Sequence, residues 1–461
     1  MSDKINLSIE SNKLIIKYYL QHFKKNFSLA FPVIFTQLGV ISIGLFDNIM
    51  VGSLGKKSLA SISLSNSIFF ILIIFGLGIS NAISSLISSL DPQKEYHKGM
   101  MIFFHGLILN FIFSLLMYGI IQIFFYIFPY LGQPIEILID TISFLKITAI
   151  SLIPWMIFEV FRKFSEGLSI IYPSLIVTWI SSITNIFFNY IFINGYLGFS
   201  KLGLIGIAYS TLISRIIMLL GIILLLHKCK KIHKYYKYCK HFFFKKKYIQ
   251  DILRIGIPSG LHMLFEMSAF SISSFISGKY GVKVLAAHQI IISLVSSTFL
   301  LNAAFSVTST IRFGNQMALK RYCELKKIGK SIFIMGLIFM SICSFLFLFF
   351  IDYIPFIYIN NDKEVISLTK NMIIVASIFQ IPDGFQSIIL GALRGMQDVK
   401  IPMYISFFSY WIVALPVSWY LSIKIKGLGV WIGLGFGIII SAILLYIRYN
   451  LLINHLIKNK K

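Results

Sequence analysis

Acidic residues are scarce in this sequence: Asp and Glu together number 17 in 461 residues, against 42 Lys and Arg. Three of the acids, Asp47, Glu266 and Asp383, nevertheless lie within runs that are otherwise almost wholly apolar. A charged side chain at the centre of a membrane helix costs about 2.5–3.5 kcal/mol on insertion scales, and such residues normally mark an ion or substrate path. The three carboxylates are therefore candidate functional residues.

Cysteine is also rare, and its spacing argues against two kinds of site. The four cysteines, Cys229, Cys239, Cys323 and Cys343, form no CxxC pair, so we expect neither a disulfide nor a cysteine metal site. The sequence has no nucleotide-binding loop and no nucleophile–base pair. We therefore expect a protein that is not an enzyme, has no cofactor, and draws its energy from an ion gradient.

Long apolar runs are what the sequence has in abundance: 57% of its residues are hydrophobic and its mean hydropathy is +0.83. About 20 apolar residues suffice to cross the hydrocarbon core of a bilayer as a helix. Twelve such spans are predicted, at 28–50, 60–88, 100–128, 133–160, 169–194, 203–227, 252–277, 283–309, 328–354, 364–391, 402–423 and 428–455.

The net charge of +25 is concentrated between these spans. If the N-terminus is cytoplasmic, most lysines and arginines fall on the cytoplasmic side, as the positive-inside rule requires. We therefore expect both termini in the cytoplasm, a location in a bacterial inner membrane among its lipids, and no nucleic-acid partner. We also expect a monomer.

The two halves of the chain resemble each other when one is shifted by 226 positions. Pro32 then falls on Pro258 and Gly55 on Gly281. Since each half has an even number of spans, the repeat is parallel, and two lobes with a cavity between them would allow alternating access by rocking. We predict an all-α integral membrane protein with twelve transmembrane helices in two parallel six-helix repeats. Its parts are a lobe at 1–227, a solvated basic linker at 228–251 and a lobe at 252–461.

Three segments carry a resemblance to a known family. They are FPVIFTQLGVISIGLFDNIMVGSLG at 31–55, GIPSGLHMLFEMSAFSISSFISGKYGVKVLAAHQI at 256–290, and QIPDGFQSIILGALRGMQDVKIPM at 380–403. Together they resemble the multidrug and toxic compound extrusion (MATE) family and its NorM-like branch. The resemblance implies export of small organic cations in exchange for Na⁺ or H⁺.

The resemblance also implies roles for particular residues. Glu266 and Asp383 match the acidic pair that binds the coupling cation. Asp47 matches the first-span acid of the other lobe, and Asn185 and Asn189 match asparagines near it. In the repeat Asp47 falls on Ser273, so the two lobes differ at these positions.

The residues themselves indicate how such an exchange would work. Burial disfavours the charged form of a carboxylate, so a buried acid can take up a proton or hold a cation. If the ion and an organic cation need the same charge, binding of one displaces the other. Gln380 and Gln386 flank Asp383 at i−3 and i+3 and are placed to orient it, while Asn185 and Asn189 share a helix face. These two asparagines serve either as interhelical hydrogen-bonding groups or as a relay.

Other interpretations remain open at this point. The acids could be satisfied by neighbouring hydroxyls and amides. Glu159 is explained by an i,i+3 or i,i+4 pair with the nearby Arg162 or Lys163, and Arg215 by pairing or snorkelling. Three other functions are considered. A flippase for a lipid-linked saccharide would use a basic cavity, and an integral membrane transferase would need a set of catalytic residues. A passive channel would not need an internal repeat.

Overall fold

The structure is a computed structural model that describes residues 2–52, 54–127, 135–238, 243–359 and 362–459, leaving aside the side chains of 2–18, 56, 59, 70, 71, 135 and 136. Cys239 lies outside the described residues. The described part of the chain is helical and contains no strand. This confirms the predicted all-α fold.

The helices form two compact units, each with its own packing. The N-unit is Phe35–Leu264, and the C-unit is Met1–Ile34 with Phe265–Lys461. Helices α1 and α9 are each divided between the two units, because the division falls inside them and not in the basic segment 228–251. The predicted lobe boundaries at that segment stay a prediction.

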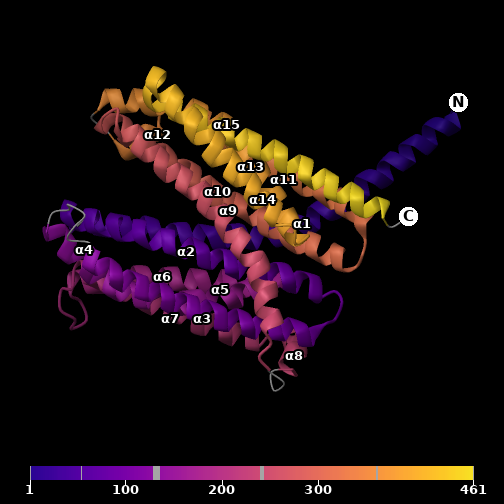
Figure 1. Ribbon diagram of the computed structural model, residues 1–461, viewed down its shortest axis with the longest axis horizontal. Coiled ribbons are helices and arrows are strands. Elements are labelled where there is room, and N and C mark those ends of the chain that lie inside the picture. Colours follow the sequence, from indigo (N-terminus) through magenta and orange to yellow (C-terminus); the bar gives the residue numbers. More distant parts are fainter. Residues whose placement is uncertain (1, 53, 128–134, 239–242, 360–361, 460–461) are drawn as a thin grey trace. The chain divides into compact units, whose positions relative to one another are not determined.

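The N-unit consists mainly of long helices that run alongside one another (Figure 1). Helix α2 packs against α3, α4 and α5, and α6 packs against α7. A Cβ atom on Gly78 of α2 would lie 2.4 Å from the Cα of Gly260 in α9, so these two backbones touch. The helices of this unit are α1 (Ser2–Gly52, in part), α2 (Lys56–Leu90), α3 (Tyr96–Ile127), α4 (Ile135–Ile150), α5 (Leu152–Gly167), α6 (Tyr172–Asn194), α7 (Leu204–His227), α8 (Lys230–Tyr236) and α9 (Lys246–Gly278, in part).

In the C-unit, α13 packs against α10, α11 and α15. Hydroxyl groups of α10 bond to α13: the Ser306 hydroxyl donates to the Ser387 carbonyl (2.7 Å) and the Thr310 hydroxyl to the Gly391 carbonyl (3.0 Å). Such interhelical bonds and small residues are how helices associate in lipid. The further helices of this unit are α10 (Val282–Ala318), α11 (Tyr322–Phe349), α12 (Ile354–Tyr358), α13 (Lys363–Gly395), α14 (Lys400–Ser406), the π-helix η3 (Phe407–Ala414) and α15 (Leu415–Lys458).

Ten stretches of the described residues are helical, long and apolar enough to cross a membrane. One of them, Lys400–Lys458, covers the two spans predicted at 402–423 and 428–455. Ile425 and Lys426 have non-helical backbone angles there, so the helix breaks between the two predicted spans. The span predicted at 252–277 lies in α9 and is outside the ten, because polar residues, among them Glu266, lower its hydropathy. Among the described residues, each of the twelve predicted spans lies largely in helix, and the span at 133–160 is divided between α4 and α5 at Ser151.

Many large apolar side chains lie exposed on single helix faces. On α11, Ile338, Ile342, Phe345 and Phe349 are each more than half exposed. Residues at this spacing line one side of a helix. A helix with an apolar outer face is what a bilayer requires of a spanning segment.

Candidate functional site

Glu266 and Asp383, the predicted coupling pair, meet in the C-unit. Glu266 lies on α9 and Asp383 on α13, and the two residues are 8% and 3% exposed. Both carboxylates accept a hydrogen bond from the same amide nitrogen, Nε2 of Gln386, at 3.1 Å and 3.3 Å. Two acids far apart in the sequence are therefore neighbours in a buried position.

Gln386 and Tyr410 complete this group, which we call the acid-pair cluster (Glu266, Asp383, Gln386 and Tyr410). The Tyr410 hydroxyl donates to Oε1 of Glu266 at 2.9 Å and accepts from Nε2 of Gln386 at 2.6 Å. Both side chains are at most 1% exposed. Gln386 was predicted to orient Asp383, and the structure shows it bonded to both acids.

Tyr410 was not predicted, because one tyrosine in an apolar run has nothing to distinguish it from the other 22 of the chain's 23. It lies within η3, where the backbone is wound as a π-helix. π-Helical turns are rare and occur frequently at functional sites. The π-helical winding around Tyr410 marks this residue in the structure, whereas the sequence gives no sign of it.

The cluster offers oxygen atoms of the kind that a hard cation binds. Oε1 of Gln386 is buried and has no hydrogen-bond partner among the residues that the structure describes. Alkaline-earth ions show this preference for carboxylate and carbonyl oxygens, and Na⁺ is a hard cation of the same kind. A proton on either carboxyl group would equally lower the repulsion within the pair.

Asp383 and Gln380 also line a small cavity of about 10 Å³, together with Ala376 and Phe379 of α13. That volume is close to what one water molecule needs. Gln380 accepts a hydrogen bond from the Thr298 hydroxyl of α10 at 3.2 Å. Gln380 therefore lies beside Asp383, as predicted, but its hydrogen bond with Thr298 ties α13 to α10.

Asp47 and the two asparagines meet in the N-unit. Nδ2 of Asn189 donates to Oδ1 of Asp47 at 2.6 Å and to Oδ1 of Asn185 at 3.2 Å. Both asparagines are fully buried on α6. The shared helix face predicted for them is what places Asn189 between its two partners.

Arg215 of α7 lies near this group and interacts electrostatically with Asp47. Its Nη1 donates to the Ser151 hydroxyl at 2.7 Å, and its guanidinium lies 4.9 Å from the ring centre of Phe69. Arg215 is thus held by a hydroxyl group and an aromatic ring within the N-unit.

The position equivalent to Asp47 in the repeat is occupied differently, as predicted. Ser273 lies on α9, and its hydroxyl is 3.3 Å from Nε2 of His288 on α10. A serine beside a histidine thus stands where the N-unit has an acid. The chemistry of the two repeats has diverged.

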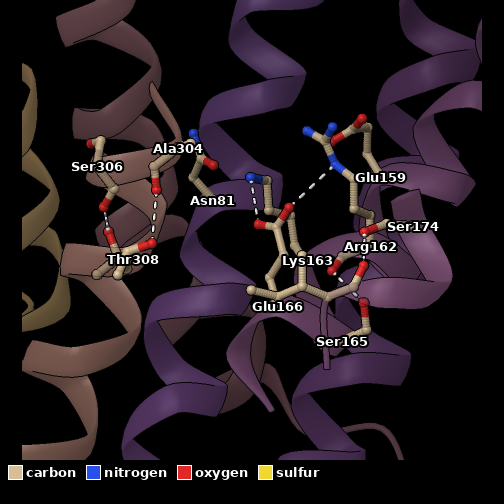
Figure 2. Close-up of polar contacts among 12 residues, drawn as sticks. Asn81, Glu159, Arg162, Lys163, Ser165, Glu166, Ser174, Ala304, Ser306 and Thr308 are labelled. Carbon is tan, nitrogen blue, oxygen red and sulfur yellow. Dashed lines mark hydrogen bonds and ion pairs between the residues drawn. The ribbon is translucent and has the colours of Figure 1, made fainter. Parts of the chain in front are cut away.

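A second buried set of charges lies on α5, and Figure 2 shows its ion pairs. Glu159 pairs with Arg162 at 2.8 Å, as its spacing predicted. Glu166 in addition lies 3.6 Å from Arg162 and 2.9 Å from Lys163. The formal charges of these four residues, which we call the α5 ion network, sum to zero, and their ion pairs form within one helix.

Known proteins resemble this chain along most of its length. The MatE family model matches residues 32–191 and 258–420, two segments whose first residues are 226 apart, the offset of the repeat (258 − 32). A probable multidrug resistance protein NorM of Listeria innocua is 30% identical over 93% of this chain and 94% of its own length. Another, of Agrobacterium fabrum, is 27% identical over 96% and 97%.

Solved structures show the same fold at low identity. The Vibrio cholerae MATE transporter VcmN superposes with a TM-score of 0.87 at 15% identity, over 95% of this chain and 98% of the other. A MOP superfamily transporter from Pyrococcus furiosus superposes with a TM-score of 0.86 at 19% identity, over 94% and 96%. The sequence matches and this fold lead to one conclusion: the chain belongs to the MatE family of multi-pass membrane transporters.

Proposed function

We propose that the protein is a secondary antiporter that exports small organic cations in exchange for Na⁺ or H⁺ by alternating access. The observation that supports this most is the acid-pair cluster, in which two buried carboxylates share one amide donor. Two negative charges this close, and out of water, cannot both be stable without a counter-charge. A proton or Na⁺ would supply it.

Exchange follows if the release of the ion and the binding of cargo depend on the same charges. The cluster without its ion has excess negative charge and favours an incoming cation. The cluster with its ion is neutralised and has lost that attraction. Asp47, Asn185, Asn189, Gln380 and Gln386 are proposed as residues of the ion or substrate path.

Small organic cations are the cargo that this charge distribution favours. The relatives named above are multidrug resistance proteins. A lipid-linked saccharide carries phosphate and would call for a basic cavity, yet the half-buried Arg215 is already engaged by the Ser151 hydroxyl. The flippase function therefore has less support than cation export. We further propose a monomer in a bacterial inner membrane with both termini cytoplasmic.

The test is transport of a fluorescent organic cation into proteoliposomes under an imposed gradient. Glu266→Gln and Asp383→Asn should each reduce gradient-driven movement to that of protein-free liposomes, because each removes one charge that the ion must neutralise. Glu364→Gln and Asp352→Asn make the same chemical changes at acids that are 64% and 71% exposed. These two controls should transport normally.

The coupling ion is identified by applying a Na⁺ gradient at constant pH and, separately, a pH gradient without Na⁺. The ion whose gradient drives the wild type is the coupling ion. A thermal unfolding midpoint in detergent close to that of the wild type shows that a variant is folded. Full transport by both cluster variants under both gradients would refute the coupling role of the pair.

A further inference from the structure

Helix α8 has two chemically different faces. Ile232 and Tyr235 are 1% and 0% exposed, whereas Lys230, His233, Lys234 and Lys237 are all exposed. The exposed four follow one another at i, i+3, i+4 and i+7, which places them on one side of the helix. The segment 228–251 was expected to be a solvated tether, but its first part is a docked amphipathic helix.

The buried face of α8 is held by Asp91, the residue that follows α2. Lys231 Nζ donates to Oδ2 of Asp91 at 2.7 Å and to the Leu168 carbonyl at 2.6 Å, and the Tyr235 hydroxyl donates to Oδ1 of Asp91 at 2.9 Å. Burial, and then the charge of Asp91, raise the pKa of Tyr235 above its usual range, so the phenol stays a donor at any physiological pH.

Gly99 of α3 makes room for this contact. A Cβ atom at Gly99 would lie 2.8 Å from the Tyr235 ring, closer than real contacts allow. Tyr96 and Phe164 pack edge-on against the same ring, with centroids at 5.1 Å and 5.5 Å. Helix α8 is therefore fixed in orientation, and its outer lysines point away from the acid that binds Lys231.

A second basic stretch with exposed aromatic rings lies before α9. Phe243 and Phe244 are 38% and 63% exposed, and Lys245, Lys246 and Lys247 follow them, also exposed. The sequence has no Asp or Glu from residue 228 to residue 250. Lysines beside aromatic rings are typical of segments that lie at a membrane–water interface.

Both stretches adjoin membrane helices. Helix α8 begins three residues after His227, the end of α7, and residues 243–247 lead directly into α9. Their charge therefore stands at the height of lipid headgroups on the side that we propose is cytoplasmic. The positive-inside rule explains lysines in such a loop, but it does not require that they be fixed on one docked face.

We propose that these two stretches form one surface, the α8 basic surface, which binds the headgroups of anionic phospholipids in the adjacent leaflet. The α8 basic surface comprises Lys230, His233, Lys234, Lys237, Phe243, Phe244, Lys245, Lys246 and Lys247. The lysines contact the phosphates, and the two rings enter the boundary between headgroups and acyl chains. Each lysine near an anionic membrane surface strengthens binding about fivefold, which corresponds to about 1 kcal/mol. This inference depends on the proposed orientation but on no assumption about cargo or coupling ion.

The test measures binding of phosphatidylglycerol and of phosphatidylcholine to the purified full-length protein in detergent, by native mass spectrometry. The triple variant Lys230→Gln, Lys234→Gln, Lys237→Gln keeps Lys231 and so keeps the contact with Asp91. It should bind phosphatidylglycerol about 10- to 100-fold more weakly, because three fivefold contributions are lost and partly screened by salt. Its weak binding of phosphatidylcholine should not change.

Two control variants separate a specific surface from total charge. Replacing the exposed Lys201, Lys363 and Lys424 by Gln removes the same charge elsewhere and should leave phosphatidylglycerol binding intact. Replacing Lys230, Lys234 and Lys237 by Arg should also preserve it. Equal binding of both lipids by the wild type, unchanged binding by the Gln variant, or displacement of lipid by co-purified nucleic acid would each overturn the proposal.

Discussion

Tyr410 is the one residue of the acid-pair cluster that can both donate to a carboxylate and accept from the amide. Its hydroxyl lies between Glu266 and Gln386, at 2.9 Å and 2.6 Å. Tyr410→Phe removes this bridge while the ring keeps its packing in the core. Loss of a bond to a buried charged group costs about 1.5–3 kcal/mol, roughly 10- to 100-fold in an equilibrium constant. We expect the concentration of driving ion for half-maximal transport to shift by that factor.

Tyr449→Phe is the matched control for this experiment. Tyr449 is also a buried tyrosine of the C-unit, 3% exposed, and its hydroxyl donates to the Leu325 carbonyl at 3.5 Å. The Tyr449→Phe variant should change stability slightly and leave the concentration of driving ion for half-maximal transport unchanged. Equal shifts in the two variants would mean that Tyr410 acts only through folding and does not position Glu266.

The sequence could predict the acids of this cluster and not the phenol, for a physical reason. Glu266 and Asp383 stand out because a charge in an apolar run is costly wherever the chain folds. Gln386 follows from helical spacing to Asp383. Tyr410 reaches the cluster only through the π-helical winding of 407–414, and that winding leaves no pattern in apolar residues. Asp47 and Asn189 were likewise predictable as neighbours, but the proximity of Arg215 required the packing of α7.

At the scale of an element, α5 shows how buried charges can be accommodated within one helix. Arg162 lies between Glu159 and Glu166, and all three are at most 14% exposed. Arg162→Met should leave two buried carboxylates with Lys163 alone, and removing one partner of a buried pair costs about 3–5 kcal/mol. We expect a clear fall in the midpoint of thermal unfolding of the purified protein in detergent.

The double variant Glu159→Gln, Arg162→Met removes one charge of each sign and should recover much of that loss. Lys98→Met is the control for a charge pair at the surface: Lys98 is 55% exposed and pairs with Glu95 at the same i,i+3 spacing. Such a pair contributes about 0–1 kcal/mol, so the midpoint should hardly move. A midpoint unchanged in Arg162→Met would show that the α5 ion network contributes little to stability.

Element boundaries were predictable where composition changes sharply, and less so elsewhere. The predicted span 203–227 matches α7 almost residue for residue, since Gly203 precedes it and lysines follow it. Helix α8 was missed because the lysine-rich segment 228–251 reads as a solvated loop in the sequence, and only the burial of Ile232 and Tyr235 reveals its docking. Periodicity shows which side of a helix is apolar, but not which neighbour covers it.

At the scale of the whole molecule, the number of membrane spans and the side of the membrane on which each loop lies depend on different features of the sequence. The twelve spans follow from apolar length alone, which sequence records directly. Their orientation rests on the distribution of lysine and arginine, a statistical bias and not a contact. The fold is compatible with either direction of insertion, so orientation has to be measured in the membrane.

Cysteine labelling provides that measurement with few changes to the chain. Cys323 is exposed at the start of α11, in a loop that we predict is cytoplasmic. In a variant with Cys229, Cys239 and Cys343 replaced by Ser, a membrane-impermeant thiol reagent should label Cys323 only after the cells are permeabilised. Adding Lys363→Cys and replacing Cys323 by Ser moves the thiol to the exposed start of α13, predicted to be outside, and this variant should be labelled in intact cells.

The two variants must behave oppositely, because an odd number of spans, here α11 alone, separates their thiols. Labelling of Cys323 in intact cells, with protection of the thiol at position 363, would invert the proposed orientation. It would then place the α8 basic surface on the outer leaflet and make the predicted charge bias misleading. Labelling of both in intact cells would mean that α11 does not cross the membrane, which its length of 28 residues and its apolar outer face argue against.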